Sequence, residues 1–118
     1  MTDRFKNKVV LITGAGQGIG LATARRMASE GAIIIAGILD DTQAEAVNEY
    51  EAIKLDVRHE ESWISAMDLL MKSHGGLDVL INNAGISPQA TAEETTPEFW
   101  DEVMAINLRG SFLGCQKA

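Results

Sequence analysis

Short apolar runs alternate with longer amphipathic stretches along this chain. One uninterrupted apolar run covers residues 9–12, and a second covers residues 33–36. Runs of this length are typical of strands that are buried on both faces, as in a parallel sheet. Their alternation with segments of helical periodicity predicts an α/β fold. The expected strands cover residues 8–13, 33–37, 52–55 and 78–82, and the expected helices cover residues 18–30, 41–49, 60–74 and 97–117.

A glycine-dense turn follows the first apolar run. Residues 13–20 read Thr-Gly-Ala-Gly-Gln-Gly-Ile-Gly, in which Gly14, Gly18 and Gly20 fit a phosphate-binding spacing. Glycine has no Cβ and tolerates positive φ, so the backbone can turn sharply and approach a ligand. The turn opens the next helix, whose first N–H groups can bind a pyrophosphate. A flexible turn is the competing interpretation, and the strand–turn–helix–strand context favours a dinucleotide site.

The order of the elements predicts how the sheet is wound. Right-handed crossovers give a doubly wound, Rossmann-like parallel sheet with strand order 3-2-1-4. A complete fold of this kind has two such halves and takes roughly twice this length. We therefore expect residues 1–118 to form a single dinucleotide-binding domain with an incomplete sheet, whose fourth strand exposes one edge.

Three further motifs point to one family. Leu55-Asp56-Val57 begins at the last residue of the third expected strand, Asn82-Asn83-Ala84-Gly85 ends the fourth, and Asn107 lies within Ile-Asn-Leu-Arg-Gly. Together with the glycine turn, they resemble the short-chain dehydrogenase/reductase family from about Lys8 to the last residue. The resemblance implies an NAD(P)-dependent oxidoreductase, which transfers a hydride between the nicotinamide and an alcohol/ketone substrate, and it implies a homo-oligomer.

The resemblance assigns the pyrophosphate to the glycine turn. Gly14, Gly18 and Gly20 would shape the loop, and the backbone N–H of Ile19 would donate to a phosphate. Gln17 stands where its side chain could lean toward the cofactor, and it could equally be a solvated loop residue.

The resemblance also assigns the adenosine half of the cofactor. Asp56 would accept a hydrogen bond from the adenine amino group, with the backbone of Val57 beside it. A strand-end cap is the alternative role of Asp56. Asn83, Ala84 and Gly85 would pack along the adenosine ribose and the central part of the cofactor.

The choice between NAD and NADP depends on the end of the second expected strand, where a carboxylate accepts from the ribose 2′-OH and repels a 2′-phosphate. Counted from Gly31, the family's acidic residue falls at Ile38. Asp40 could serve instead if the turn bends back, or it could cap the next helix. No Lys or Arg occurs between Arg26 and Lys54. We therefore expect a modest preference for NAD over NADP.

By resemblance, catalysis needs a Tyr general acid/base, a Lys four residues later, a Ser and an Asn. A phenol with its ordinary pKa of about 10 is a poor base at neutral pH, so the cation is necessary. Asn107 matches the catalytic Asn, which helps hold a proton-relay water, and the other members would lie beyond Ala118. The 118-residue chain is therefore expected to be the cofactor-binding half and inactive alone. A non-catalytic dinucleotide-binding or assembly module is the alternative.

One literal match to the catalytic pair occurs elsewhere. Tyr50 and Lys54 have the Tyr-xxx-Lys spacing, but they lie between the second expected helix and the third expected strand. This position is at the adenine end or the sheet edge and is far from any nicotinamide. We therefore interpret the match as chance.

Charge and composition exclude several classes of function. The chain has 17 acidic and 10 basic residues and a formal net charge of −7, which disfavours binding to nucleic acid or to anionic membranes. His59 and His74 lie outside any metal-ligand spacing, so no metal site is expected. The charged start and the absence of a long apolar run predict a soluble cytoplasmic protein.

Helical spacing predicts which side chains are buried in the third helix. Ile64, Met67, Leu70 and Met71 recur at this spacing and predict its core-facing side. Cys115 is the only cysteine and is expected to be a small buried hydrophobe.

Overall fold

The computed structural model describes residues 2–87 and 89–118. Strands and helices alternate along the chain. The elements are β1 (Val9–Ile12), α1 (Gly18–Ser29), β2 (Ile33–Ile38), α2 (Asp41–Ala46), β3 (Glu51–Lys54), α3 (Glu60–His74), β4 (Val79–Ile81), α4 (Pro97–Met104), a π-helical segment (Ala105–Arg109) and α5 (Gly110–Lys117). Among the described residues, no helix is long and apolar enough to cross a membrane.

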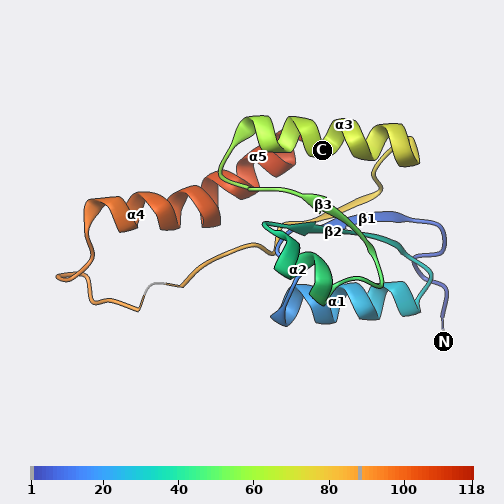
Figure 1. The fold of residues 1–118 in the computed structure, drawn as a ribbon, viewed down its shortest axis with the longest axis horizontal. Helices are drawn as coiled ribbons and strands as arrows, with labels where there is room; N and C mark the ends of the chain where they lie inside the picture. Colours follow the sequence, from blue (N-terminus) through green and yellow to red (C-terminus); the bar gives the residue numbers. More distant parts are fainter. Residues whose placement is uncertain (1, 88) are drawn as a thin grey trace.

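The four strands form one parallel sheet in the order β3-β2-β1-β4, which confirms the predicted order 3-2-1-4. In the register, Val10 of β1 lies between Ile34 of β2 and Val79 of β4. Figure 1 shows α1 and α2 on one side of the sheet and α3 and α5 on the other. The predicted α/β, Rossmann-like architecture is therefore present, in the form of one half of a doubly wound sheet.

β1 is buried on both faces, as its uninterrupted apolar run predicts. Val10 and Ile12 belong to a core cluster that includes Met27 of α1. Leu11 points the other way, into a second cluster that includes Leu70 of α3. Because successive side chains of a strand alternate between faces, this one strand contributes to both cores and holds the glycine turn at its end rigidly.

The predicted core face of α3 is partly wrong. Met67 and Leu70 are buried, whereas Ile64 is 43% exposed and Met71 is 51% exposed. Each of these two residues is next in sequence to a buried residue, and one residue turns a helix by about 100°. The buried stripe has the helical i, i+3, i+4, i+7 spacing and consists of Trp63, Ala66, Met67 and Leu70.

The predicted helix 97–117 is divided into three parts. Thr96 caps α4, because its hydroxyl accepts from the N–H of Phe99 at 3.1 Å. The π-helical segment joins α4 to α5, and Figure 1 shows α4 extending away from the sheet while α5 returns to it. Cys115 of α5 is exposed, so the prediction of a buried thiol is wrong. Leu113 of the same helix packs in the core, and two residues turn a helix by about 200°, which places Cys115 on the opposite side.

Candidate functional site

The turn between β1 and α1 leaves the first N–H groups of α1 available. The first backbone bond at this end of the helix runs from the N–H of Leu21 to the carbonyl of Gln17 at 3.2 Å. The N–H groups of Gly18, Ile19 and Gly20 precede it, and the Gln17 side chain forms no capping bond. Gly18 has φ +52°, a conformation that suits glycine. The helix therefore begins with unpaired donors among the described residues.

Gly20 is required for contact between the turn and the end of β4. A Cβ built on Gly20 would lie 2.5 Å from the carbonyl oxygen of Gly14 and 2.5 Å from Nδ2 of Asn83. No side chain fits in this space. Gly20 allows the glycine turn to pack directly against the Asn-Asn-Ala-Gly turn, and it is not among the residues that line the cavity described below.

The hydroxyl of Thr13 joins the same two turns. It is buried, and its oxygen accepts from the N–H of Asn83 at 3.0 Å and from the N–H of Ala84 at 2.9 Å. The Asn83 side chain also bonds the first turn, because its Nδ2 donates to the carbonyls of Thr13 at 3.1 Å and Gly14 at 3.2 Å. The two turns therefore form one hydrogen-bonded unit at the carboxyl ends of β1 and β4.

Asp56 lies beyond the end of β3 and is held by Arg58. Nε and Nη2 of Arg58 donate to the two carboxylate oxygens of Asp56 at 2.9 and 2.6 Å, and the Ser62 hydroxyl accepts from the Asp56 N–H at 2.8 Å. The Arg58 hydrogen bonds hold the pKa of the Asp56 carboxyl below its ordinary value. Because a carboxylate has about four lone-pair sites, Asp56 can still accept from a ligand.

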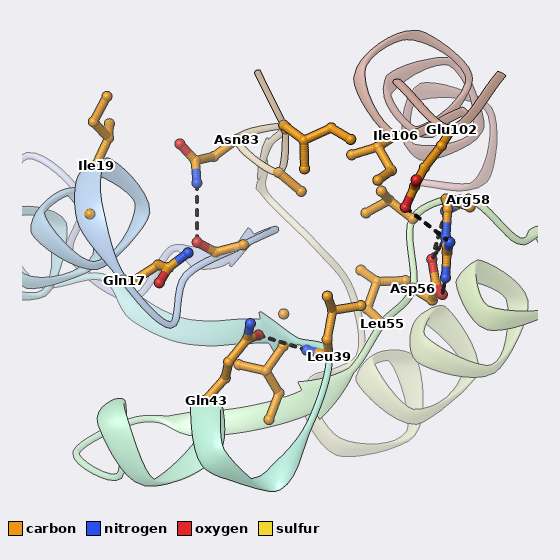
Figure 2. Close-up of a pocket in the computed structure, with 18 residues that line it drawn as sticks. Gln17, Ile19, Leu39, Gln43, Leu55, Asp56, Arg58, Asn83, Glu102 and Ile106 are labelled. Atoms are coloured by element: carbon orange, nitrogen blue, oxygen red, sulfur yellow. Dashed lines mark hydrogen bonds and ion pairs between the residues drawn. The ribbon is translucent and has the colours of Figure 1, made fainter. Parts of the chain in front are cut away.

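A cavity of about 490 Å³ connects these features. Figure 2 shows the glycine turn at one end and the Asp56–Arg58 pair at the other, with Glu102 and Ile106 above it. Nine of the predicted cofactor residues line this cavity, namely Gly14, Gln17, Gly18, Ile19, Asp56, Val57, Asn83, Ala84 and Gly85.

Three predicted site residues do not line the cavity. Gly20 packs behind the glycine turn. Asp40 caps α2, because its Oδ1 accepts from the N–H of Gln43 at 2.9 Å, which is the alternative role that the sequence left open. Asn107 lies in the π-helical segment and its side chain bonds the backbone of Ile86.

The cavity also has lining residues to which the sequence assigned no cofactor contact. They are Gly37, Ile38, Leu39, Gln43, Leu55, Arg58, Ile86, Glu102 and Ile106. Leu55 and Arg58 flank the Asp56-Val57 motif, and Ile106 precedes Asn107, so these three could have been found from the motifs. Gln43 is the third residue after the helix cap Asp40, a position at which a Gln side chain often hydrogen-bonds the backbone before the helix. This position is the one feature of the sequence that could have indicated its place in the cavity.

Tyr50 and Lys54 do not form a catalytic pair in this structure. Tyr50 precedes β3 and Lys54 is its last residue, so they share no helical turn. Lys54 pairs with Asp41 at 3.6 Å, and burial raises the pKa of the Tyr50 phenol. A catalytic phenol needs the opposite shift. Neither residue lines the cavity.

The histidines have carboxylate neighbours. Nε2 of His74 lies 2.6 Å from a carboxylate oxygen of Glu51, and Nε2 of His59 lies 3.8 Å from Oδ2 of Asp56. Within residues 2–87 and 89–118, no group of three or more His, Cys, Asp or Glu side chains is arranged to hold a metal ion.

Known proteins share both the sequence pattern and the fold. The 3beta-hydroxysteroid dehydrogenase 1 of Eggerthella lenta is 35% identical over an alignment of 127 residues, gaps included, and the alignment covers 100% of this chain and 49% of that protein. The D-threitol dehydrogenase of Mycolicibacterium smegmatis is 39% identical over 121 residues, which cover 96% of this chain and 46% of that protein. The chain thus spans about half the length of the curated relatives it matches.

Two solved structures superpose closely. The 3-ketoacyl-(acyl-carrier-protein) reductase from Brucella melitensis, complexed with NADH, matches with a TM-score of 0.90 and 35% identity over 95% of this chain and 49% of that one. The ligand-free aldohexose dehydrogenase of Thermoplasma acidophilum matches with a TM-score of 0.90 and 32% identity over 100% of this chain and 45% of that one. A family model described as short chain dehydrogenase matches residues 8–118, and the chain belongs to this family.

Proposed function

We propose that the cavity binds a nicotinamide dinucleotide, and that the protein containing this chain transfers a hydride between this cofactor and an alcohol/ketone substrate. The observation that carries the proposal is the joined pair of turns at the carboxyl ends of β1 and β4, which opens into a cavity ending at Asp56. Ligands of doubly wound sheets bind at this edge, where the strand order reverses. Membership of the short chain dehydrogenase family supports the class of reaction.

The start of α1 is where the pyrophosphate would bind. The N–H groups of Gly18 and Ile19 lie at the cavity wall, and the helix dipole gives this end a partial positive charge of about half an elementary charge. The open space next to Gly18, in which a Cβ would meet no atom within 4 Å, leaves room for phosphate oxygens. These features fit an anionic group without a basic side chain.

The other end of the cavity fits adenine. Leu55 and Ile106 provide apolar lining, and the carboxylate of Asp56 provides an acceptor for an exocyclic amino group. Arg58 keeps this carboxylate ionised, so it can accept and cannot donate. Ala84 and Gly85, on the wall between the two ends, would lie along the sugar and the central part of the cofactor.

Asn107 is a positioning residue in this proposal. Both polar groups of its carboxamide are bonded to Ile86, so its side chain holds the turn that carries Gly85. The family's general acid/base is not supplied by Tyr50, whose pKa is raised. We therefore propose that the 118-residue chain binds cofactor and shows no turnover by itself.

Calorimetric titration with NADH tests the site through two matched variants. Gly18→Val and Gly75→Val each place a side chain at a helix end with positive φ, at +52° and +75°, where a Cβ meets no atom within 4 Å. Only Gly18 lines the cavity. The proposal expects wild-type protein and Gly75→Val to bind NADH alike and Gly18→Val to bind at least about tenfold more weakly. Equal affinities in both variants would refute the proposed phosphate site.

A further inference from the structure

One corner of the cavity lacks the charged side chain that commonly selects the cofactor. The charged lining residues Asp56, Arg58 and Glu102 stand together at the adenine end. Figure 2 shows Leu39, which follows β2, and Gln43 of α2 between this group and the glycine turn. A ribose that joins an adenine at Asp56 to a pyrophosphate at Gly18 must pass this corner.

The orientation of the Gln43 amide follows from its hydrogen bond. The N–H of Leu39 donates to Oε1 of Gln43 at 2.9 Å. A backbone N–H can only donate, so the amide oxygen must face Leu39 and the amide nitrogen must face away from it. Figure 2 shows this nitrogen directed toward the glycine turn. Nε2 makes no hydrogen bond with any residue in the described ranges, so both of its protons are available to a ligand.

Two contacts hold Gln43 in place. Its backbone N–H donates to Oδ1 of Asp40 at 2.9 Å, which places it in the first turn of α2. Its side chain passes Gly16 so closely that a Cβ on Gly16 would lie 2.9 Å from the Cβ of Gln43. The backbone and the Cβ of Gln43 are therefore held by Asp40 and Gly16, and its amide oxygen is held by Leu39, before any ligand binds.

We propose that Nε2 of Gln43 donates a hydrogen bond to the 2′ position of the adenosine ribose. Because this donor accepts either cofactor, the site discriminates only weakly between NAD and NADP. The proposal rests on the proposed dinucleotide function. A neutral amide donor can pair with the oxygen of a 2′-OH or with a 2′-phosphate, whereas a carboxylate repels the phosphate. Asp40, whose carboxylate caps α2 at the same corner, leaves a small bias toward NAD through solvent, whereas Lys54 offsets the charge of Asp41. NADH and NADPH therefore bind within about tenfold of each other.

The test is the ratio of the NADPH and NADH dissociation constants, measured by calorimetry in Gln43→Glu. This substitution keeps an oxygen for the N–H of Leu39 and replaces only the amide donor with a carboxylate oxygen. Thr42→Glu is the matched control, because it adds the same charge one residue away, at an exposed position outside the cavity lining. Gln43→Leu, which removes the amide without adding charge, is a second variant.

Gln43→Glu is expected to weaken NADPH binding by about tenfold while leaving NADH binding nearly unchanged. Thr42→Glu is expected to leave the ratio close to that of the wild type, and Gln43→Leu to weaken NADPH more than NADH. An equal ratio in Gln43→Glu and Thr42→Glu would overturn the role of Gln43 while the dinucleotide site stands. A wild-type protein that binds neither cofactor would instead overturn the proposed function itself.

Discussion

The carboxamide of Asn107 forms two hydrogen bonds with the backbone of Ile86. The N–H of Ile86 donates to Oδ1 at 2.8 Å, and Nδ2 donates to the Ile86 carbonyl at 2.7 Å. This pair ties the π-helical segment to the loop that follows β4. A π-helical turn inside a longer helix is often found at functional sites. Here it directs the Asn107 side chain at the turn that forms one wall of the cavity.

Removing the Asn107 side chain should loosen this loop. Asn107→Ala deletes both bonds to Ile86, and we expect the free energy of unfolding to fall by about 1–3 kcal/mol. Asn82→Ala is the control, since within residues 2–87 and 89–118 the one hydrogen bond of the Asn82 side chain is a weak 3.7 Å contact with the sulfur of Cys115. Urea unfolding measures stability, and amide hydrogen exchange reports on Ile86. Unchanged exchange at Ile86 in Asn107→Ala would contradict this role.

Thr13 should be more sensitive to loss of its hydroxyl than of its methyl group. Thr13→Val keeps the shape but removes the acceptor of the Ala84 N–H, which we expect to cost about 1–3 kcal/mol. The Asn83 N–H loses one of its two acceptors and keeps the carbonyl of Ile81 at 3.0 Å. Thr13→Ser keeps the hydroxyl and should lose less stability. Denaturant unfolding of both variants distinguishes them, and a larger loss in Thr13→Ser would show that packing dominates at this site.

The ionisation of Asp56 should depend on Arg58. Because hydrogen bonds from Arg58 lower the pKa of Asp56, this pair stabilises the folded state fully above the unfolded-state pKa of about 4. The contribution is lost as the pH falls through the lower, folded-state value. Arg58→Ala should move the Asp56 pKa back toward its ordinary value, measured by NMR of the carboxyl carbon. An identical pKa in both proteins would show that Arg58 does not hold the carboxylate.

The 118-residue chain should show no dehydrogenase turnover alone. Positioned proton transfer is worth roughly 10²–10⁴ in rate, and the Tyr50 phenol is shifted away from the pKa that such transfer needs. An absorbance assay for reduced cofactor, with a panel of alcohols and ketones, checks this. Turnover that disappears in Tyr50→Phe would show that the Tyr50 and Lys54 pair is catalytic after all.

The arrangement of strands was predictable, because it depends on apolar runs and on the handedness of crossovers. The run at residues 9–12 identified a strand buried on both faces, and the right-handed crossovers of a doubly wound sheet predicted the order 3-2-1-4. The bounds of α2 were less predictable. The expected helix 41–49 ends at Ala46, and the chain continues in tighter turns, in which the N–H of the buried Val47 donates to the carbonyl of Ala44 at 3.2 Å.

Contacts between turns were beyond the reach of sequence patterns. The spacing of glycines identified the phosphate-binding turn, but the role of Thr13 depends on residues about 70 positions away in the chain. The Gln43 amide likewise reaches the cavity only because Gly16 leaves space for it. The single-domain organisation, the homo-oligomer and the cytoplasmic location stay predictions.

The most direct test of the dinucleotide site is a map of amide chemical shifts during titration of the protein with NADH. We predict saturable shifts at Gly18 and Ile19, at Val57 and at Gly85, which line the cavity from end to end. The amide chemical shift of Gly75, at the C-terminal end of α3, should not change. Saturable shifts that spare the glycine turn, or no saturable binding, would contradict the assignment of this cavity to a nicotinamide dinucleotide.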